Sequence, residues 1–416
     1  MSLYKFEIKK LFRNKKNKIM ILCLIIYLLA MVINNISNVA YVNANGETIE
    51  GINAVIKLRA EKEKWNGELT IDTVKKVINN NKEINNNPNY LSNNGELSDA
   101  GYYYLQGSQD LRKMINRSFG GMQNYDYYLI NTLEESQADK FYENRVNAIE
   151  EWLSRSDVKD HYSKDEKNYI IKQFNSMESP IYYSYMDGWK KIIAFLPTLL
   201  YAVTIISCII VANIFTVEYE KKAAPVFFST FKGRDKAISS KILAALVVVS
   251  ALYFISVFFI LLLFLGVFGT EGANCVIQAN PDYWFSMYNI TNIQAVAIIL
   301  VMGFIGCLFM VSITLYMASL TRSSNIAVIF SFLLIMGTGV FGQLFDSSSI
   351  SKIMNFFPDK LFMGNTLLNQ YNILKIANNN VDFIIVLLII YSVLLVYFLL
   401  MTYRRNVCAK EIEVKM

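Results

Sequence analysis

The chain has 416 residues, of which 54% are hydrophobic, 14% aromatic and only 18% charged, with a formal net charge of +6. A soluble domain normally carries about 25% charged residues, so this composition excludes an ordinary soluble globular protein. The hydrophobic residues gather in blocks without Asp, Glu, Lys, Arg or His, each long enough to cross a bilayer as a helix. Six blocks predict an all-α polytopic membrane protein with spans at Ile19–Val42, Ile192–Val217, Ile242–Phe268, Ile293–Leu320, Ile326–Phe345 and Phe383–Tyr403.

The first predicted element is a cytoplasmic interfacial helix over residues 1–18. Leu3, Phe6, Leu11 and Phe12 share one stripe of this helix, and its lysines lie on the opposite face. That pattern predicts an amphipathic helix that lies in the membrane interface and leads into the first span. A basic anchor that only sets the orientation of the chain is the alternative, and the two are compatible.

Lys and Arg near the ends of spans mark the cytoplasmic side, and the N-terminal segment carries seven of them against a single Glu7. We expect a multi-pass protein of the cell membrane with both termini in the cytoplasm. The first span is expected to be kept rather than cleaved as a signal peptide, because its apolar run extends to Val42. The expected cytoplasmic segments are 1–18, 218–241, 321–325 and 404–416, and the expected extracellular segments are 43–191, 269–292 and 346–382.

The segment 43–191, between the first two spans, is too long for a loop and long enough to form a domain. Its periodicity is helical. Thr70–Ile78 is one helical stretch, and Ser163–Glu166 has the pattern of a capping box that opens a helix through Met177. An Asn-rich run around Pro88 predicts a surface loop. We therefore expect a mainly helical extracellular domain.

Nothing in this domain predicts catalysis, a metal site or a cofactor. The only histidine, His161, fits a surface position better than a ligand, and no Cys/His spacing suits zinc. Tyrosines cluster at Tyr102–Tyr104, Tyr125–Tyr128 and Tyr182–Tyr185. The last cluster, with Trp189, precedes the second span and predicts an interfacial belt, whereas core packing and ligand contact remain equal alternatives for the other two.

The later spans contain two groups of glycines and are joined by a broken external segment. Glycines permit close helix approach, either between two chains or within one chain. The positions are Gly303, Gly306, Gly337, Gly339 and Gly342. The segment 346–382 is interrupted at Pro358 and Gly364, which predicts short re-entrant or interfacial helices rather than a span.

The spans and a cytoplasmic insert suggest a transporter, but the sequence contains no means of powering one. An ion-coupled carrier places ionisable residues within its spans, and this chain has none there. A nucleotide-binding P-loop requires Gly-x-x-x-x-Gly-Lys followed by Ser or Thr, and no such match occurs. The chain is therefore not expected to be an enzyme, and a separate polypeptide would have to supply the energy through a docking surface.

The segment 218–241 has the features of such a surface. Lys221, Lys222, Lys232 and Arg234 keep it out of the hydrocarbon, since each charge costs about 2.5–3.5 kcal/mol there. On a helix that begins near Pro225, three phenylalanines would form one exposed patch suited to a groove on a partner: Phe227, Phe228 and Phe231. An interfacial helix with these rings among lipid headgroups is an equal alternative on physical grounds.

The stretch Glu218–Leu246 resembles the first cytoplasmic loop of type-2 ATP-binding cassette export permeases. An acidic–aromatic–acidic start leads into a short coupling helix in that family, followed by Gly-Arg and by a lysine that opens the third span. The matching residues here are Glu218, Tyr219, Glu220, Gly233, Arg234 and Lys241. The family commonly has a glycine soon after the second acid, whereas this chain has Lys222–Pro225, so the entry turn differs.

The resemblance implies a transporter built from two permease chains, identical or homologous, and two cytosolic ATP-binding cassette ATPase subunits. The ATPase would contact Glu218, Tyr219, Glu220, Phe227, Phe228, Phe231, Lys232 and Arg234. We expect the chain to export an antimicrobial peptide, a hydrophobic drug or a lipid-like cargo from a bacterial cell, with no cofactor and no nucleic acid. A membrane sensor or resistance protein that does not transport, and whose ectodomain binds an external ligand, is the alternative.

Overall fold

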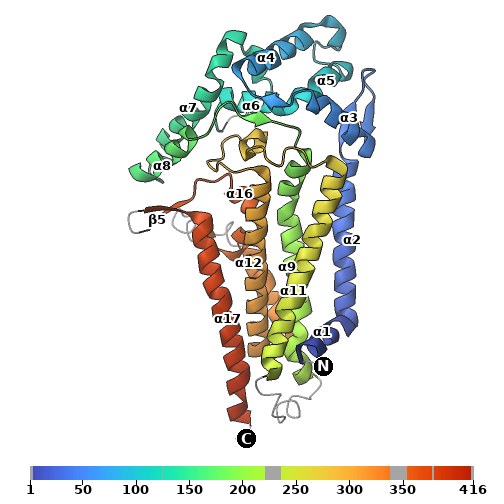
Figure 1. Ribbon diagram of the computed structural model, residues 1–416, viewed down its shortest axis with the longest axis vertical. Coiled ribbons are helices and arrows are strands. Elements are labelled where there is room, and N and C mark those ends of the chain that lie inside the picture. The colour runs from blue at the N-terminus through green and yellow to red at the C-terminus, as the bar shows by residue number, and fades with distance from the viewer. Residues whose placement is uncertain (1–2, 124, 221–235, 338–353, 377–378, 414–416) are drawn as a thin grey trace.

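The computed structural model describes residues 3–123, 125–220, 236–337, 354–376 and 379–413, and it is mostly helical, as predicted (Figure 1). Five helices in this part of the chain are long and apolar enough to cross a membrane. They are α2 (Lys15–Ser37), α9 (Asp187–Glu220), α11 (Lys236–Phe268), α12 (Asn292–Thr321) and α17 (Phe383–Glu413). They run along the long axis of the molecule, and a separate head of short helices lies at one end (Figure 1).

The sixth predicted span is represented by a shorter helix. α13 (Ser324–Ile335) has 12 residues, which at 1.5 Å each is about 18 Å, less than the roughly 30 Å of a hydrocarbon core. The predicted span Ile326–Phe345 continues past residue 337, beyond the described residues. The structure therefore establishes five candidate spans and leaves the predicted count of six as a prediction.

The helix α1 (Leu3–Arg13), which was predicted to be interfacial, ends just before the long helix α2 begins. Asn14 separates the two, and its side chain accepts a hydrogen bond from the backbone N–H of Lys16, which caps α2. The predicted stripe is divided between two environments: Leu11 is buried in the chain, whereas Leu3, Phe6 and Phe12 are exposed. These exposed apolar side chains suit a membrane interface.

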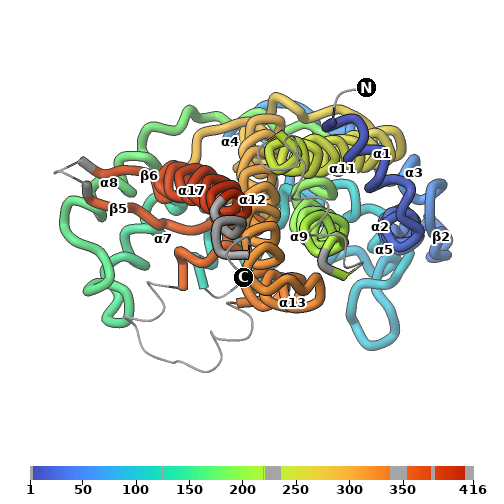
Figure 2. The backbone as a smooth tube through the Cα atoms, turned by 90° about the horizontal axis from the view of Figure 1, so that it is seen from below, coloured from blue at the N-terminus to red at the C-terminus, as the bar shows by residue number. Residues whose placement is uncertain are grey.

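The helix α12 is the centre of the bundle. Seen from below, it lies between α17 on one side and α9 and α11 on the other (Figure 2). A Cβ atom at Gly303 would lie 2.5 Å from the Leu200 side chain on α9, and one at Gly306 would lie 2.9 Å from Leu361. These two glycines therefore serve close packing within the chain, one of the two alternatives that the sequence left open.

Residues 40–186 form a head domain at the end of the bundle remote from α1. Its helices are α3 (Ile52–Glu63), α4 (Ile71–Asn86), α5 (Asp99–Leu105), α6 (Gln109–Gly120), α7 (Phe141–Ser154) and α8 (Lys164–Asn175). The predicted capping box is confirmed, since Ser163 and Glu166 exchange side-chain and backbone hydrogen bonds at the start of α8. The Thr70 side chain caps α4 by accepting a hydrogen bond from the backbone N–H of Thr73.

The core of the head domain includes residues from beyond the second span. Trp284 is fully buried against Phe141, and the Arg145 guanidinium donates a hydrogen bond of 2.8 Å to the Trp284 carbonyl. Tyr371 packs against Trp152 and Phe174. The loops before α12 and α17 are therefore part of this domain's core, which the sequence did not predict.

Short antiparallel strands accompany the helices, which an all-α prediction omitted. The pairs are β1 (Ala40–Val42) with β2 (Thr48–Glu50), β3 (Gly67–Glu68) with β4 (Tyr182–Tyr183), and β5 (Ile373–Ile376) with β6 (Asn379–Asp382). The helix α2 ends at Ser37, before the predicted end of the first span at Val42, because β1 begins at Ala40.

Short helices complete the connections. They are η1 (Pro88–Tyr90), η2 (Gln106–Ser108), η3 (Leu129–Thr132), η4 (Glu135–Lys140), η6 (Ile277–Ala279), η7 (Pro281–Tyr283), η8 (Pro358–Leu361) and α16 (Gly364–Leu367). η8 and α16 lie within the predicted broken segment and begin at the proline and glycine that were expected to interrupt it. The β5–β6 hairpin follows them and leads into α17.

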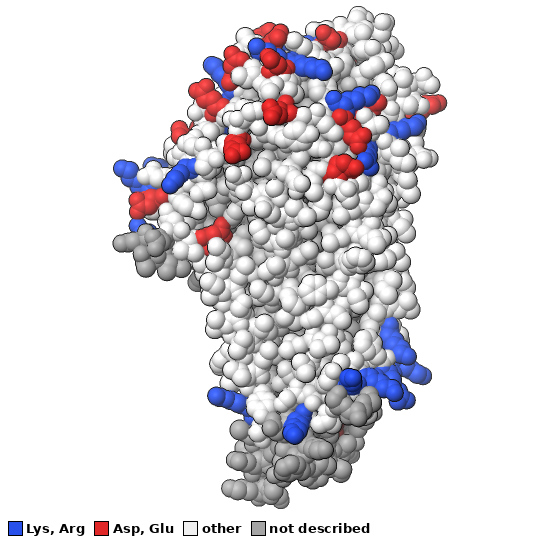
Figure 3. All heavy atoms as spheres, viewed as in Figure 1, with Lys and Arg blue, Asp and Glu red and all other residues white. Residues whose placement is uncertain are grey.

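Charged side chains occupy the two ends of the molecule. On the face shown in Figure 3, the head carries both signs, the opposite end carries Lys and Arg, and the band between them is free of charge. Exposed side chains in this band are apolar, as at Phe254, Ile255 and Phe258 of α11. A contiguous apolar surface of this kind is suited to contact with lipid.

Candidate functional site

The predicted contact surface begins and ends at the basic end of the bundle. α9 ends at Glu220 and α11 begins at Lys236, and α1 lies beside both helix ends (Figure 1). Glu218, Tyr219 and Glu220 lie in the last turn of α9. The other predicted contact residues lie outside the described residues: Phe227, Phe228, Phe231, Lys232 and Arg234.

Glu218 is the centre of a buried group of charges. Its Oε1 lies 2.7 Å from Lys10 Nζ on α1, and its Oε2 lies 2.7 Å from Lys241 Nζ on α11. The side chain of Lys241 is only 2% exposed and that of Glu218 only 8%. Charges buried to this degree require partners, since an unpaired one would cost several kcal/mol. Glu218 therefore joins three helices at one point.

Two further interactions complete this group. Lys241 also donates to the carbonyl of Ile214 at 2.9 Å and lies over the Phe215 ring. Glu7 is buried on α1, with its Oε2 3.8 Å from Lys10 Nζ. Burial raises the pKa of Glu7, and the nearby Lys241 and Lys10 only partly offset this. We call Glu7, Lys10, Glu218 and Lys241 the stem cluster.

The sequence named two residues of the stem cluster, but in other roles. The family resemblance gave Glu218 as an ATPase contact and Lys241 as the lysine that opens the third span, whereas the structure buries both in one ion pair. Glu7 and Lys10 were interpreted only as part of a basic amphipathic helix. The available signal was the position of Glu7, the single acid among seven basic residues and three positions before Lys10, so that the two share a helix face.

Glu220, another of the predicted contact residues, is exposed and reaches the start of α13. Its Oε1 lies 3.3 Å from Ser324 Oγ, at the start of α13. Arg405 on α17 donates to the Ser319 carbonyl at the end of α12. At this end of the bundle, α9 thus contacts α13, and α17 contacts α12.

A second buried charged group lies at the other end of α9. Lys62 Nζ is 2.7 Å from Asp187 and 3.3 Å from Asp110, and Lys190 Nζ is 2.7 Å from Asp110. Tyr183 donates its hydroxyl to Asp110 at 3.2 Å. We call Lys62, Asp110, Tyr183, Asp187 and Lys190 the head cluster. It joins α3 and α6 of the head domain to the first turn of α9.

The electrostatics of the head cluster favour its ionised form. Burial alone would raise the pKa of Asp110, but the ammonium groups of Lys190 and Lys62 outweigh it and hold that pKa well below its usual value. The pKa of Lys62 is raised, because attraction to Asp110 and Asp187 outweighs its burial. Both groups are therefore charged at neutral pH.

The tyrosine clusters have structural roles. Tyr183 and Tyr185 are fully buried, so only Tyr182 of the predicted interfacial belt is exposed. Tyr103 and Tyr104 pack ring against ring, with Tyr41 and Tyr90 as further neighbours. Tyr128 is 67% exposed, and the hydroxyl of its neighbour Tyr127 accepts part-buried hydrogen bonds from Gln109 and Arg112.

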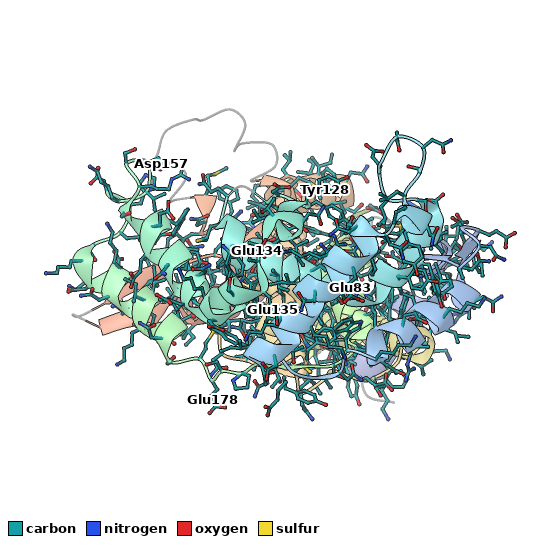
Figure 4. All side chains as sticks on the ribbon, turned by 90° about the horizontal axis from the view of Figure 1, so that it is seen from above. Glu83, Tyr128, Glu134, Glu135, Asp157 and Glu178 are labelled. Atoms are coloured by element: carbon teal, nitrogen blue, oxygen red, sulfur yellow. The ribbon has the colours of Figure 1, made fainter. Side chains whose placement is uncertain are left out.

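The upper surface of the head carries exposed side chains, and most of those labelled in Figure 4 are acidic. Figure 4 shows Glu83, Tyr128, Glu134, Glu135, Asp157 and Glu178 pointing outward from it. Glu134 and Glu135 are exposed, and His161 is exposed in a turn, as the sequence predicted for this histidine. No group of three or more His, Cys, Asp or Glu side chains in the described ranges could hold a metal ion.

One helix therefore connects two buried charged groups. α9 has 34 residues, about 50 Å at 1.5 Å per residue, with Asp187 of the head cluster at one end and Glu218 of the stem cluster near the other. After Lys190 and Lys191, the helix carries no charged residue as far as Val217, and it packs on α12 and α11.

Comparison with known proteins supports a membrane transport role. Residues 1–404 match the family model described as ABC-2 family transporter protein. No curated protein and no solved structure matches the chain. The family match extends over α1, the head domain, four of the candidate spans and most of the fifth, α17, and it confirms the resemblance to this family. The chain therefore belongs to the ABC-2 family of transporter proteins.

Proposed function

We propose that this chain is the membrane permease subunit of an ATP-driven exporter, and that a separate ATPase docks on residues 218–241. Membership of the ABC-2 family implies a multi-pass, non-catalytic membrane subunit that works with an ATPase subunit. The position of the ATPase, the direction of transport and the nature of the cargo are the parts that we add.

The observation that carries the proposal is the stem cluster. Both ends of the segment 221–235 continue into helices that are joined to each other and to α1 by buried ion pairs. Removing one partner of a buried pair typically costs about 3–5 kcal/mol, so these joints resist separation. A partner that moved the segment would therefore displace α9, α11 and α1 together.

The distribution of charge supports the orientation that we propose. α1 and the start of α2 carry most of the basic residues at one end, and Arg404 and Arg405 lie at the same end of α17. With that end in the cytoplasm, the segment 218–241 faces a cytosolic ATPase and the head domain is extracellular. We propose two copies of the ATPase and a second permease chain, identical or homologous.

The cargo that we propose is hydrophobic or amphipathic: an antimicrobial peptide, a hydrophobic drug or a lipid-like molecule. The predicted spans contain no ionisable side chain. A pathway formed by such helices offers no fixed charge with which to bind an inorganic ion. Apolar surface on the cargo would instead match the apolar lining.

Affinity purification tests the docking role. Replacing Phe227, Phe228 and Phe231 with Asp should abolish co-purification of the ATPase from membranes of the native host, because three carboxylates cannot enter an apolar groove unpaired. The purified proteins are identified by mass spectrometry, and insertion is checked by gel filtration of the variant.

A matched variant carries the same chemical change in the head domain. Tyr125, Tyr128 and Tyr182 are exposed aromatic residues there, and replacing them with Asp should leave ATPase co-purification unchanged. Retention of the ATPase by the phenylalanine variant would contradict docking at 218–241. Purification of the unaltered chain without any ATPase would instead favour a sensor that does not transport.

A further inference from the structure

An apolar cavity of about 280 Å³ lies between α2, α9 and α11, at the end of the bundle where α1 lies. Its walls include Ile21, Ile25 and Leu28 of α2 and Ala251 of α11. Phe12 of α1 forms part of the wall nearest the basic end of the molecule. None of the residues that line this cavity belongs to the segment 218–241, and the proposed function does not use it.

The lining of the cavity selects an apolar occupant. A buried water needs two to four polar partners, and Ser256 is the one residue with a polar side chain among the described residues that line the cavity. Its volume is nearly twice the roughly 150 Å³ of an engineered apolar cavity that stays dry and binds benzene. A flexible hydrocarbon chain therefore suits the space better than water does.

The cavity is open toward the surface that a bilayer would cover. Ile25 and Ile255 both line it and are both exposed, Ile255 at 67%. Ala251 is exposed as well. A hydrocarbon chain can therefore enter sideways from the membrane, without passing through the bundle.

Two exposed basic residues are close in sequence to residues that line the cavity. Lys18 is three residues before Ile21 and seven before Ile25, so it continues the stripe of α2 that lines the cavity. Arg13 follows Phe12 directly. Both side chains are exposed, and the sequence has no acidic residue between Glu7 and Glu47. The basic surface at the lower end of Figure 3 includes this region.

We propose that the cavity binds one acyl chain of an anionic phospholipid, whose headgroup contacts Lys18 and Arg13. The lipid belongs to the leaflet in which α1 lies. Its chain follows the apolar stripe of α2, and Phe12 covers it from α1. Because α1 also carries Lys10 of the stem cluster, a lipid bound here holds α1 against α2 and α11.

Photocrosslinking in nanodiscs tests this site. The full chain is reconstituted in phosphatidylcholine that contains a phosphatidylglycerol with a diazirine in one acyl chain. After illumination, mass spectrometry of peptides should find the label on α2 between Lys18 and Leu28 and on α11 between Val248 and Phe259. A phosphatidylcholine with the diazirine at the same carbon should label these peptides no more than other exposed helix faces.

Two pairs of variants test separately the contacts of the acyl chain and those of the headgroup. Ala251→Phe fills the cavity and should remove the label from these peptides, whereas Val247→Phe, exposed on the same helix outside the cavity lining, should not. Lys18→Gln should lower phosphatidylglycerol labelling about fivefold, since each basic residue near an anionic lipid surface contributes about 1 kcal/mol. Arg404→Gln, at the same end of α17, should leave the labelling unchanged.

Two results would overturn the proposal. Equal labelling by the phosphatidylglycerol and phosphatidylcholine probes would reduce the site to ordinary lipid contact. Undiminished labelling of Ala251→Phe, with a thermal transition like that of Val247→Phe, would show that the acyl chain does not occupy the cavity.

Discussion

Asp110 and Glu218 are each buried between two lysines, one near either end of α9. A carboxylate buried in either position without a lysine partner would be strongly destabilising, and so would a buried lysine without its carboxylate. The apolar helix between the two groups contains no other charge in its predicted span. The buried ion pairs of Asp110 and Glu218 thus join neighbouring helices at the two ends of the bundle.

Asp110→Asn is expected to destabilise the head domain by about 3–5 kcal/mol at neutral pH, because two buried lysines lose their partner. The folded pKa of Asp110 is depressed, so its stabilising effect is complete above its unfolded pKa of about 3.9 and is lost as pH falls through that value toward the folded pKa. As the pH falls below about 4, the free energy of unfolding should therefore decrease less for the variant than for the unaltered chain.

Tryptophan fluorescence during heating measures this effect, since the chain's four tryptophans, Trp65, Trp152, Trp189 and Trp284, all lie in or beside the head domain. Asp139→Asn is the matched control, because Asp139 is exposed, and it should change the free energy of unfolding by less than about 0.5 kcal/mol. Equal effects of the two substitutions would contradict the role of the head cluster.

The packing of α9 on α12 depends on one close approach. Leu200 of α9 occupies the space that a side chain at Gly303 of α12 would fill. The helices can therefore approach more closely here than two side chains would allow, which increases the van der Waals contact that stabilises membrane helix bundles.

Gly303→Val should destabilise the bundle by about 1–3 kcal/mol, because its added atoms overlap Leu200. Adding Leu200→Ala should recover part of this loss, since it vacates the same space, and the double-mutant cycle would give a favourable coupling energy. Thermal unfolding of the purified chain in detergent measures each variant. Gly266→Val is the control, because a Cβ at Gly266 meets no atom within 4 Å. Similar losses at both glycines, without rescue, would refute the argument.

Elements with strong local signals were predictable. The capping box at Ser163 and the cap at Thr70 follow from side chains three residues from their hydrogen-bonding partners. The strands β1 to β6 carry too few residues for a periodic pattern, and their pairing depends on contacts such as that of Gly67 with Tyr183. For the same reason, the predicted first span continued to Val42 and wrongly included the residues of β1.

The molecule as a whole has an apolar band between a basic end and a head of mixed charge. If the basic end is cytoplasmic, the head domain is exposed outside the cell. In a background in which Cys23, Cys208, Cys275, Cys307 and Cys408 are replaced, Tyr128→Cys should react with a membrane-impermeant maleimide on intact cells, since Tyr128 is 67% exposed on the head.

Lys16 is exposed at the end of the bundle opposite the head. Lys16→Cys should therefore react with the maleimide only after the cells are permeabilised. Labelling is read by the mass of the purified protein. The reverse pattern would invert the proposed orientation and would place the segment 218–241 outside, where no cytosolic ATPase could reach it.

The sequence alone determined the class of this protein and most of its long helices, and it named Glu218 and Lys241 without their pairing. These features depend on the length of apolar runs, local periodicity and a short motif, all of which are read within one segment. Only the tertiary structure decided that Lys10 pairs with Glu218, 208 residues away, and that Trp284 completes the core of the head domain. Such contacts depend on how whole helices pack and on the burial that packing imposes, and neither is encoded in the pattern of any single segment.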